Sequence, residues 1–264
     1  MFDLPSKRQI KLIKALVQLK NYRKKHGLFI VEGLRAAEEA LNSDYSIEFL
    51  LVSDDFLHRH GEKIKKYGKI KTYMVPRKEY EGLSDTETPQ GIMAVVRMKS
   101  FELEDLCEEN FLIVALDGIK DPGNIGSIIR TADAAGANGI LAGKGCADVY
   151  SPKVVRSTMG SIFHVPIIER VDLLEVLKEL SQRGARIVTT YLGADKSYFD
   201  ANLTGPIVLV FGSEAEGVSP EILEISSELV KIPMPGKAES LNVAVASGIV
   251  LFEAVRQRSV SFTL

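Results

Sequence analysis

"FLIVALDGIKDPGNIGSIIRTADAAGANGILAG", residues 111–143, decides the fold class of this chain. Its first nine residues form a continuous apolar run, typical of a strand that is covered on both faces in a parallel sheet. Residues 125–136 predict a helix that Gly136 ends, and residues 139–143 predict a second short strand. A strand, a helix and a strand in this order favour an α/β fold.

The remainder of the second half continues this alternation. Apolar runs predict further strands at 186–192, 207–214 and 229–234, and helical patterns occupy 172–184 and 241–258. We therefore expect a doubly wound α/β domain. Ligands in such domains usually bind beyond the carboxyl ends of the strands.

The first hundred residues predict a separate, small α/β unit. Ser6 is a plausible N-cap for a first helix, and short strands and helices alternate from there, including a polar helix at 60–68. Segment 99–110 is charged, has an acidic run and lacks a strong apolar period. We predict a small domain at 1–100, a linker at 101–110 and a second domain at 111–264.

Composition favours a globular, cytoplasmic protein. The chain has 264 residues, of which 45% are apolar and 26% charged. No apolar run approaches membrane-spanning length, and no signal-peptide core precedes the first charges. The two cysteines show no metal or redox spacing and the four histidines form no HExxH pair, so we expect neither a metal site nor a disulfide.

Charge is distributed unevenly although the net charge is only −2. Residues 1–100 carry +6 and residues 101–264 carry −8, which suggests two modules with different partners. The first 25 residues are the most basic, and from charge alone they form either a solvated helix face or an arm that neutralises phosphates. For the second case, the candidate nucleic-acid-binding residues are Lys7, Arg8, Lys11, Lys24 and Lys25.

Two unusual loops follow predicted strands. In the first, a Pro-Gly-Asn turn opens a helix whose N-terminus can attract an anion, and Arg130 lies six residues after Asn124. Its glycines give GxxG and not the dinucleotide pattern GxGxxG. In the second, Gly212 and Gly217 allow a close backbone approach, and Glu214 needs a partner such as a cationic ligand or Arg130. A plain glycine turn with a surface arginine is the alternative for the first loop, and an N-cap serine is the alternative for the second.

The third unusual loop joins the last predicted strand to the last helix. Pro233 and Pro235 fix two φ angles and leave backbone groups outside regular structure, where they can read a flat base. Ser240 is the expected N-cap of the helix, which places Asn242 in its first turn. The helix is apolar on nearly every side, so we expect it to be buried on several sides.

These segments resemble a known family. "NIGSIIRTADAAG" (124–136), "VFGSEAEGVSP" (210–220) and "IPMPGKAESLNVAVASGIVLFEAV" (232–255) resemble the three signature motifs of the SpoU (TrmH-like) branch of the SPOUT RNA methyltransferases. "SPKVVRSTMGSIFHVPI" (151–167) resembles the segment between the first two motifs. "FIVEGLRAAEEAL" (29–41) and "TPQGIMAVV" (88–96) resemble the small ribosomal-protein-like substrate-binding domain of many members, although Pro89 stands where members often have His.

The resemblance implies S-adenosylmethionine as the methyl donor, a ribose 2′-hydroxyl of structured RNA as the acceptor, a trefoil knot and a homodimer. It implies cofactor contacts from Gly212, Gly217, Ile232, Met234 and Leu241. It implies a polar reaction centre of Asn124, Arg130, Glu214, Ser240 and Asn242. Arg156 and Ser157 would help to bind RNA.

Methyl transfer from a sulfonium needs an in-line nucleophile and neither a metal nor a covalent enzyme intermediate. We expect Arg130 to hold a phosphate or alkoxide, because guanidinium groups stay protonated near pH 7. Asn124 and Ser240 would orient the hydroxyl, and Glu214 would position Arg130 or assist proton removal. One side of the apolar last helix would pack on a second subunit.

Two other functions remain open at this point. The same chemistry on tRNA is one, although the additional small domain favours ribosomal RNA. A non-catalytic RNA-binding dimer is the other, and the intact set of Asn124, Arg130, Glu214 and Asn242 argues against it. A nicotinamide dehydrogenase is excluded, because no GxGxxG follows a strand.

Overall fold

The computed structural model describes residues 2–65, 68 and 70–260. The chain forms two compact units, one comprising Met1–Lys99 and Asp148–His164 and the other comprising Ser100–Ala147 and Val165–Leu264. Segment 148–164 thus groups with the first unit, although the predicted second domain contains it. Among the described residues, no helix is both long enough and apolar enough to cross a membrane.

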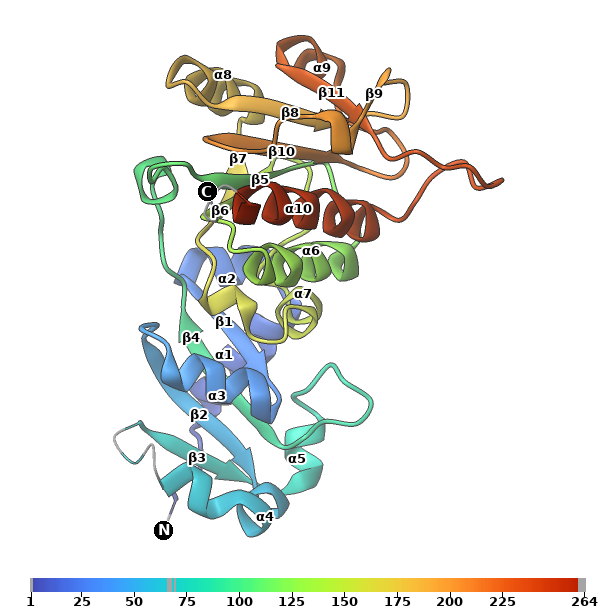
Figure 1. Cartoon of the computed structure of the whole chain (residues 1–264). Coiled ribbons are helices and arrows are strands. Elements are labelled where there is room, and N and C mark those ends of the chain that lie inside the picture. Colours follow the sequence, from blue (N-terminus) through green and yellow to red (C-terminus); the bar gives the residue numbers. More distant parts are fainter. Residues whose placement is uncertain (1, 66–67, 69, 261–264) are drawn as a thin grey trace. The chain divides into compact units, whose positions relative to one another are not determined.

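Within the described residues, a seven-stranded sheet forms the centre of the second unit (Figure 1). Its strands lie in the order β7-β6-β5-β10-β8-β11-β9, and all neighbours are parallel. The strands are β5 (Leu112–Asp117), β6 (Gly139–Gly143), β7 (Ile167–Val171), β8 (Arg186–Thr190), β9 (Lys196–Ser197), β10 (Ile207–Gly212) and β11 (Glu228–Lys231). The predicted doubly wound α/β fold is confirmed.

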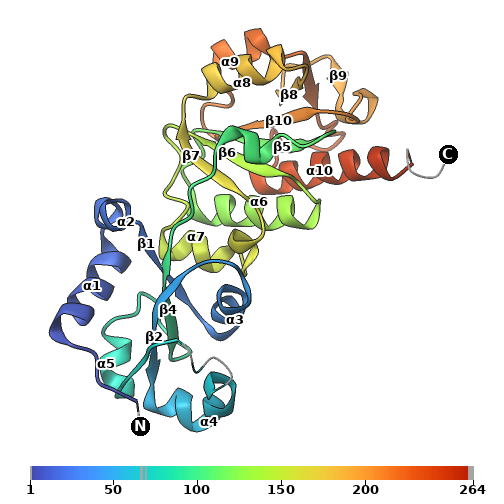
Figure 2. The ribbon, with the colours of Figure 1, turned by 90° about the vertical axis from the view of Figure 1, so that its left-hand side faces the viewer.

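Helices cover both faces of this sheet, as Figure 1 and Figure 2 show. On one face, α6 and α10 pack side by side, and α8 and α9 lie together on the other. The helical elements of this unit are η1 (Leu103–Leu106), α6 (Pro122–Ala134), α8 (Leu173–Gln182), η3 (Tyr198–Asp200), α9 (Pro220–Ile225) and α10 (Val243–Val260). Residues of the sheet and of the α8 and α9 layer form one core, in which Ile113 and Val208 of the sheet pack with Leu177 of α8.

Both helices on the first face begin at a side-chain cap. Asp121 accepts a hydrogen bond from the backbone N–H of Asn124 at 2.9 Å, and Pro122 occupies the first position of α6. For α10 the prediction of Ser240 as N-cap is wrong. The side-chain oxygen of Asn242 accepts hydrogen bonds from the backbone N–H groups of Ala244 and Val245 at 3.0 and 3.3 Å, so the helix begins two residues later.

The first unit contains a four-stranded mixed sheet in the order β1-β4-β2-β3, counted over the residues that the structure describes. In this sheet β2 and β3 pair in parallel, whereas β4 pairs antiparallel with both β1 and β2. The strands are β1 (Leu28–Glu32), β2 (Ile47–Ser53), β3 (Thr72–Val75) and β4 (Ile92–Arg97). The helical elements are α1 (Lys7–Gln18), α2 (Lys20–His26), α3 (Leu34–Asn42), α4 (Asp54–Lys65), α5 (Arg77–Glu81), α7 (Pro152–Ser157) and η2 (Ser161–Phe163).

One helix in this unit begins where the sequence predicted, and another begins earlier. Ser6 caps α1 as predicted, since its hydroxyl oxygen accepts from the Gln9 N–H at 3.3 Å. The polar helix predicted at 60–68 begins earlier, at Asp54, and is interrupted by a non-helical His60. Residues 66–67 of that prediction lie outside the described residues.

Segment 148–164 is fixed in the first unit by a buried ion pair and by aromatic packing. Arg23 Nη2 lies 2.6 Å from Asp148 Oδ2, and the two side chains are only 5% and 7% exposed. The same guanidinium donates through Nη1 to the carbonyl oxygen of Leu16 at 2.7 Å, so this buried N–H group is also hydrogen-bonded. Phe163 packs edge-on against Tyr45, with 5.1 Å between ring centroids. Arg23, although basic, is thus a structural residue.

Candidate active site

A cavity of about 340 Å³ lies in the second unit, at the carboxyl ends of β8, β10 and β11. This is the edge at which a doubly wound sheet usually binds its ligands. All five residues predicted to contact the cofactor line the cavity: Gly212, Gly217, Ile232, Met234 and Leu241. The structure therefore brings together the second and third unusual loops, which are separate in the sequence.

The loop after β10 is a tight turn that only glycine permits at its base. Ser213 and Gly217 exchange two backbone hydrogen bonds, of 3.1 and 2.9 Å, and Gly217 has a φ of +71°. A Cβ atom on Gly212 would collide with the backbone of Gly217 and Val218. The glycine at 212 thus lets the turn fold back onto its own strand and form one wall of the cavity.

Asp117 anchors the far end of this turn. Its Oδ2 accepts hydrogen bonds from the backbone N–H and the hydroxyl of Ser219, at 2.8 and 2.7 Å. Asp117 is the last residue of β5 and lies opposite Gly212 in the register of β10. Ser219 does occupy the N-cap position of α9, but its hydroxyl binds Asp117 and makes no capping hydrogen bond. The turn is therefore held to the neighbouring strand at both ends.

The loop between β11 and α10 forms the opposite wall. Figure 1 shows this connection leaving the sheet as an irregular extension before α10 begins. Between residues 232 and 241 the backbone groups make no hydrogen bond with any other described residue. They remain available to a ligand, as the two prolines in the sequence predicted.

Three polar side chains form a chain of hydrogen bonds beside the cavity. Asn242 Nδ2 donates to Asn124 Oδ1 at 2.9 Å, and Asn124 Nδ2 donates to Glu214 Oε1. The oxygen of Asn242 is already used by the first amides of α10, so its NH₂ group must face Asn124. The start of the helix thereby fixes the orientation of Asn124 and, through it, the Glu214 carboxylate.

Ser240 and Glu214 both line the cavity, whereas Asn124, Asn242 and Arg130 do not. The Arg130 side chain is exposed and makes no hydrogen bond or ion pair with the residues that the structure describes. Six residues along a helix rotate a side chain to roughly 120° from the starting direction, so Arg130 points away from Asn124. Of the two partners predicted for Glu214, a cationic ligand or Arg130, Arg130 does not bind it within this chain, and Glu214 accepts a hydrogen bond from Asn124.

Sequence reasoning missed two contributors to this site. Thr190, Tyr191 and Leu192 line the cavity at the end of β8, and Asp117 holds the glycine turn. The signal was present, since both segments follow buried strands and carboxyl ends of parallel strands meet at one edge. Over the described residues, no group of three or more His, Cys, Asp or Glu side chains could hold a metal ion.

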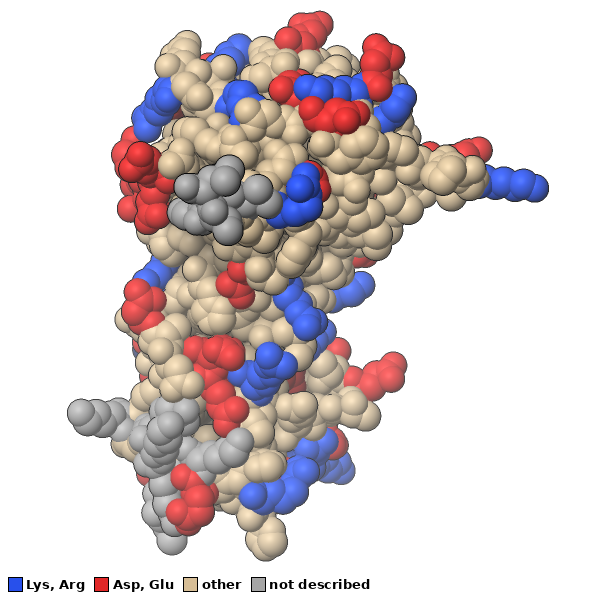
Figure 3. Space-filling model, viewed as in Figure 1, with Lys and Arg blue, Asp and Glu red and all other residues tan. Residues whose placement is uncertain are grey.

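The predicted RNA-binding residues lie in the first unit. Lys7, Arg8 and Lys11 are exposed on α1, Lys25 is exposed on α2, and Lys24 is half-buried. Figure 3 shows Lys and Arg interspersed with Asp and Glu on the face that it draws, rather than gathered in one patch.

Two predicted RNA contacts lie on α7 and are already engaged within the unit. Arg156 binds Asp85 through both terminal nitrogens, at 2.5 and 3.3 Å. Ser157 donates its hydroxyl to the carbonyl oxygen of Lys153 at 2.9 Å. Each side chain therefore already has a partner within the unit.

Comparison with known proteins agrees with this geometry. The SpoU rRNA Methylase family model matches residues 111–252, and the MRM3-like substrate binding domain model matches residues 7–94. These matches define the class as an RNA methylase with a substrate-binding domain. The chain belongs to the SpoU rRNA methylase family.

Relatives and solved structures match over nearly the whole chain. The 23S rRNA (guanosine(2553)-2′-O)-methyltransferase RlmP of Bacillus subtilis is 35% identical over 88% of this chain and 90% of its own length. A 23S rRNA (uridine(2479)-2′-O)-methyltransferase of Streptomyces viridochromogenes is 36% identical over 93% of this chain and 88% of its own length. The crystal structure of AviRb from Streptomyces viridochromogenes, in complex with AdoMet, superposes with a TM-score of 0.86 at 33% identity and covers 96% of this chain and 99% of that one.

Proposed function

We propose that the protein transfers a methyl group from S-adenosylmethionine to a ribose 2′-hydroxyl of ribosomal RNA. The observation that carries this proposal is the cavity in which the glycine turn after β10 and the irregular loop before α10 face one another. Its volume, about 340 Å³, lies within the usual range of roughly 300–1,000 Å³ for small-molecule sites. Ribosomal RNA as substrate also fits the cytoplasmic location predicted from the sequence.

The residues of the cavity fit the donor. Gly212 and Gly217 leave room for close approach, and the unpaired backbone of residues 232–241 offers donors and acceptors for the edge of an adenine. Met234, Leu241 and Val243 supply apolar surface for a thioether and a purine ring. The bound donor would supply a methyl group on a positively charged sulfur that leaves readily.

The chain's own polar residues would activate the acceptor hydroxyl. Ser240 and Glu214 line the cavity, and Glu214 keeps one carboxylate oxygen beyond the one that Asn124 occupies. We assign to Glu214 the acceptance of the hydroxyl proton, to Ser240 the orientation of the hydroxyl, and to Asn124 and Asn242 the positioning of Glu214. Groups of this kind typically contribute about a hundredfold or more in rate.

Arg130 would act in a second subunit. Its side chain points away from its own Asn124 and has no partner among the described residues, so the guanidinium group is free to hold a phosphate or alkoxide elsewhere. On α10, Val245 and Phe252 are 52% and 50% exposed and lie seven residues apart, hence on one side of the helix. We infer a homodimer that covers this side. The trefoil knot implied by the family resemblance stays a prediction.

The substrate is tested with purified protein and radiolabelled S-adenosylmethionine. Deproteinised ribosomal RNA from cells that lack the gene should accept methyl groups, and total tRNA should not. Asn124→Ala and Glu214→Gln should lower the rate about a hundredfold, whereas Glu221→Gln, an exposed carboxylate on α9, should leave it unchanged. Incorporation into tRNA alone would favour the alternative substrate. Absence of heat on titration with S-adenosylmethionine would favour the non-catalytic RNA-binding dimer.

A further inference from the structure

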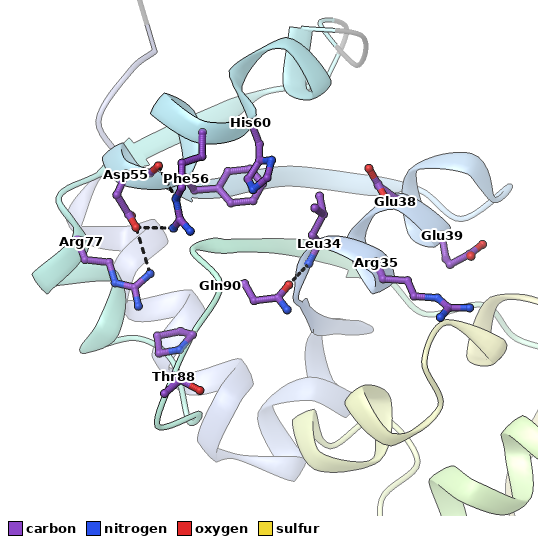
Figure 4. A pocket seen from close by; sticks show the side chains of 12 residues that line it. Leu34, Arg35, Glu38, Glu39, Asp55, Phe56, His60, Arg77, Thr88 and Gln90 are labelled. Carbon is purple, nitrogen blue, oxygen red and sulfur yellow. Dashed lines mark hydrogen bonds and ion pairs between the residues drawn. The ribbon is translucent and has the colours of Figure 1, made fainter.

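Two hollows in the first unit share one rim. The larger, of about 1,020 Å³, and the smaller, of about 210 Å³, are both lined by Arg35, Thr88 and Gln90, which we call the shared rim. The shared rim combines the start of α3 with the loop between α5 and β4. Figure 4 shows the larger hollow, with Gln90 against the start of α3 and Arg35 extending away from Asp55.

The shared rim carries several hydrogen-bond donors that nothing in the unit uses. Arg35 and Thr88 form no side-chain hydrogen bond or ion pair with the residues described. Gln90 is held in place because its Oε1 accepts the backbone N–H of Leu34 at 2.7 Å. This bond occupies the oxygen of the amide and leaves its NH₂ group facing the hollows.

The other arginines of the larger hollow are already neutralised. Asp55 binds Arg59 at 2.7 Å and Arg77 at 3.4 Å, and Arg77 also binds Glu81 at 2.6 Å. Glu38 and Glu39 line the same hollow. Its charges therefore nearly balance, so it is a poor site for phosphate alone.

The smaller hollow has an acceptor at its wall and a fixed arginine at its edge. Glu32 is only 7% exposed and accepts hydrogen bonds from Ser84 at 2.6 Å and Tyr80 at 3.3 Å. Arg156 enters from α7 and is fixed by Asp85, the residue next to Ser84. The loop between α5 and β4 is thus held at two consecutive residues, Ser84 and Asp85. The donors of the shared rim and the Glu32 acceptor are therefore pre-organised.

We propose that the shared rim binds one unpaired base of the RNA substrate and contributes base-specific recognition, while the basic side chains of α1 and α2 bind phosphates. This inference rests on the proposed function and deepens it. Unstacked RNA bases stack on arginine planes and form hydrogen bonds through their edges. Balanced charge, free donors and a buried carboxylate suit a base, since phosphate contacts position the RNA and base contacts specify it.

The test compares two RNAs over a series of salt concentrations. The probes are transcribed 23S ribosomal RNA and a fully paired RNA duplex, with binding of the full chain measured by filter retention. Arg35→Ala and Gln90→Ala should each weaken binding to the ribosomal RNA about tenfold and leave duplex binding and the salt slope unchanged. The double substitution Lys7→Ala and Lys11→Ala should weaken binding to both RNAs equally. It should also lower the salt slope by about one for each phosphate contact that is lost.

Arg35→Lys separates a base contact from a phosphate contact. Lysine keeps the charge but lacks the planar fork, so it should fail to restore ribosomal RNA binding. Arg97→Ala, an exposed arginine on β4 outside both hollows, is the matched control and should behave as wild type. The affinity for S-adenosylmethionine should stay unchanged in every variant. The melting temperature should stay unchanged as well, except in Gln90→Ala, which removes the acceptor of the Leu34 N–H and should melt slightly earlier.

The outcomes separate this inference from the proposed function. Base recognition would be overturned in favour of a phosphate contact by either of two results. In one, Arg35→Lys binds the ribosomal RNA as wild type does; in the other, Arg35→Ala weakens binding to both RNAs equally. Unchanged binding by Arg35→Ala and Gln90→Ala, or a wild type without preference for ribosomal RNA, would overturn the site itself. A wild type that prefers ribosomal RNA but does not methylate it would contradict the proposed function and leave the shared rim supported.

Discussion

Asn242 donates its side-chain amide to Asn124 across 2.9 Å while its oxygen caps the first turn of α10. One residue therefore both starts a helix and orients the group that holds Glu214. Stability and reactivity at this position depend on different atoms of the same side chain, so substitutions can separate them.

Asn242→Ser should separate the two roles. Serine caps a helix about as well as asparagine, so the free energy of unfolding should stay close to that of wild type, whereas Asn242→Ala should cost about 1 kcal/mol. Both variants lose the hydrogen bond to Asn124 and should lower the methyl-transfer rate to a similar degree. Denaturant unfolding and single-turnover rates measure the two effects. Full activity in Asn242→Ser would show that Asn124 needs no such positioning.

Gly212→Ala should abolish binding of S-adenosylmethionine and destabilise the fold. The added methyl group would collide with the backbone of Gly217 and Val218, so the turn cannot close over the cavity. Gly236→Ala is the matched control, because a Cβ there meets no atom within 4 Å. Calorimetric titration measures the affinity. Equal affinities in the two variants would refute the role assigned to the turn.

Arg130→Ala should lose methyl transfer and keep the affinity for S-adenosylmethionine. If Arg130 serves the second subunit, a mixture of Arg130→Ala and Asn124→Ala chains forms heterodimers with one intact site. Activity should then recover to about a quarter of wild type after the subunits exchange.

Recovery in this mixture requires a dimer, which provides the control. Val245→Glu combined with Phe252→Glu in both chains should give monomers by sedimentation and prevent recovery. Leu19→Glu, another exposed apolar position but in the first unit, should leave the dimer intact. A mixture that stays inactive while the dimer persists would place Arg130 in its own subunit's site.

Glu32→Gln should change how stability depends on pH. Burial raises the pKa of Glu32 above its ordinary value of 4.5, so the folded chain holds this proton more tightly than the unfolded chain does. Wild type should therefore lose stability relative to the variant as the pH rises from 4.5 through the raised pKa. Melting temperatures of both proteins between pH 4 and about pH 8 measure the difference. A difference that is independent of pH would contradict the raised pKa.

The fold could be predicted from the sequence because its central strands are buried on both faces. β5 and β10 are continuous apolar runs, which distinguishes them from an amphipathic helix such as α8. β7 was missed for a physical reason. It is an edge strand whose register shifts against β6, it contains Glu169 and Arg170, and Arg170 has a φ of +61°. Such a strand has no apolar period to detect.

The glycines and prolines of the sequence predicted the loops that line the site, whereas the contacts of its polar side chains were harder to predict. Ser240 and Asn242 are both good capping residues, and the path of the chain after the prolines decides between them. That Glu214 and Arg130 of one chain do not pair could have been expected from the sequence, because the six residues between Asn124 and Arg130 do not complete whole turns of a helix. The ion pair of Arg156 with Asp85 joins residues 71 positions apart and left no local signal.

The buried pair of Arg23 and Asp148 has a consequence for synthesis of the chain. A ribosome must translate well past the middle of the sequence before the partner of Arg23 emerges, and until then a desolvated cation would have no counter-ion. The first unit is therefore expected to mature late despite its early position. A fragment truncated at residue 99 would lack a piece of its own interior.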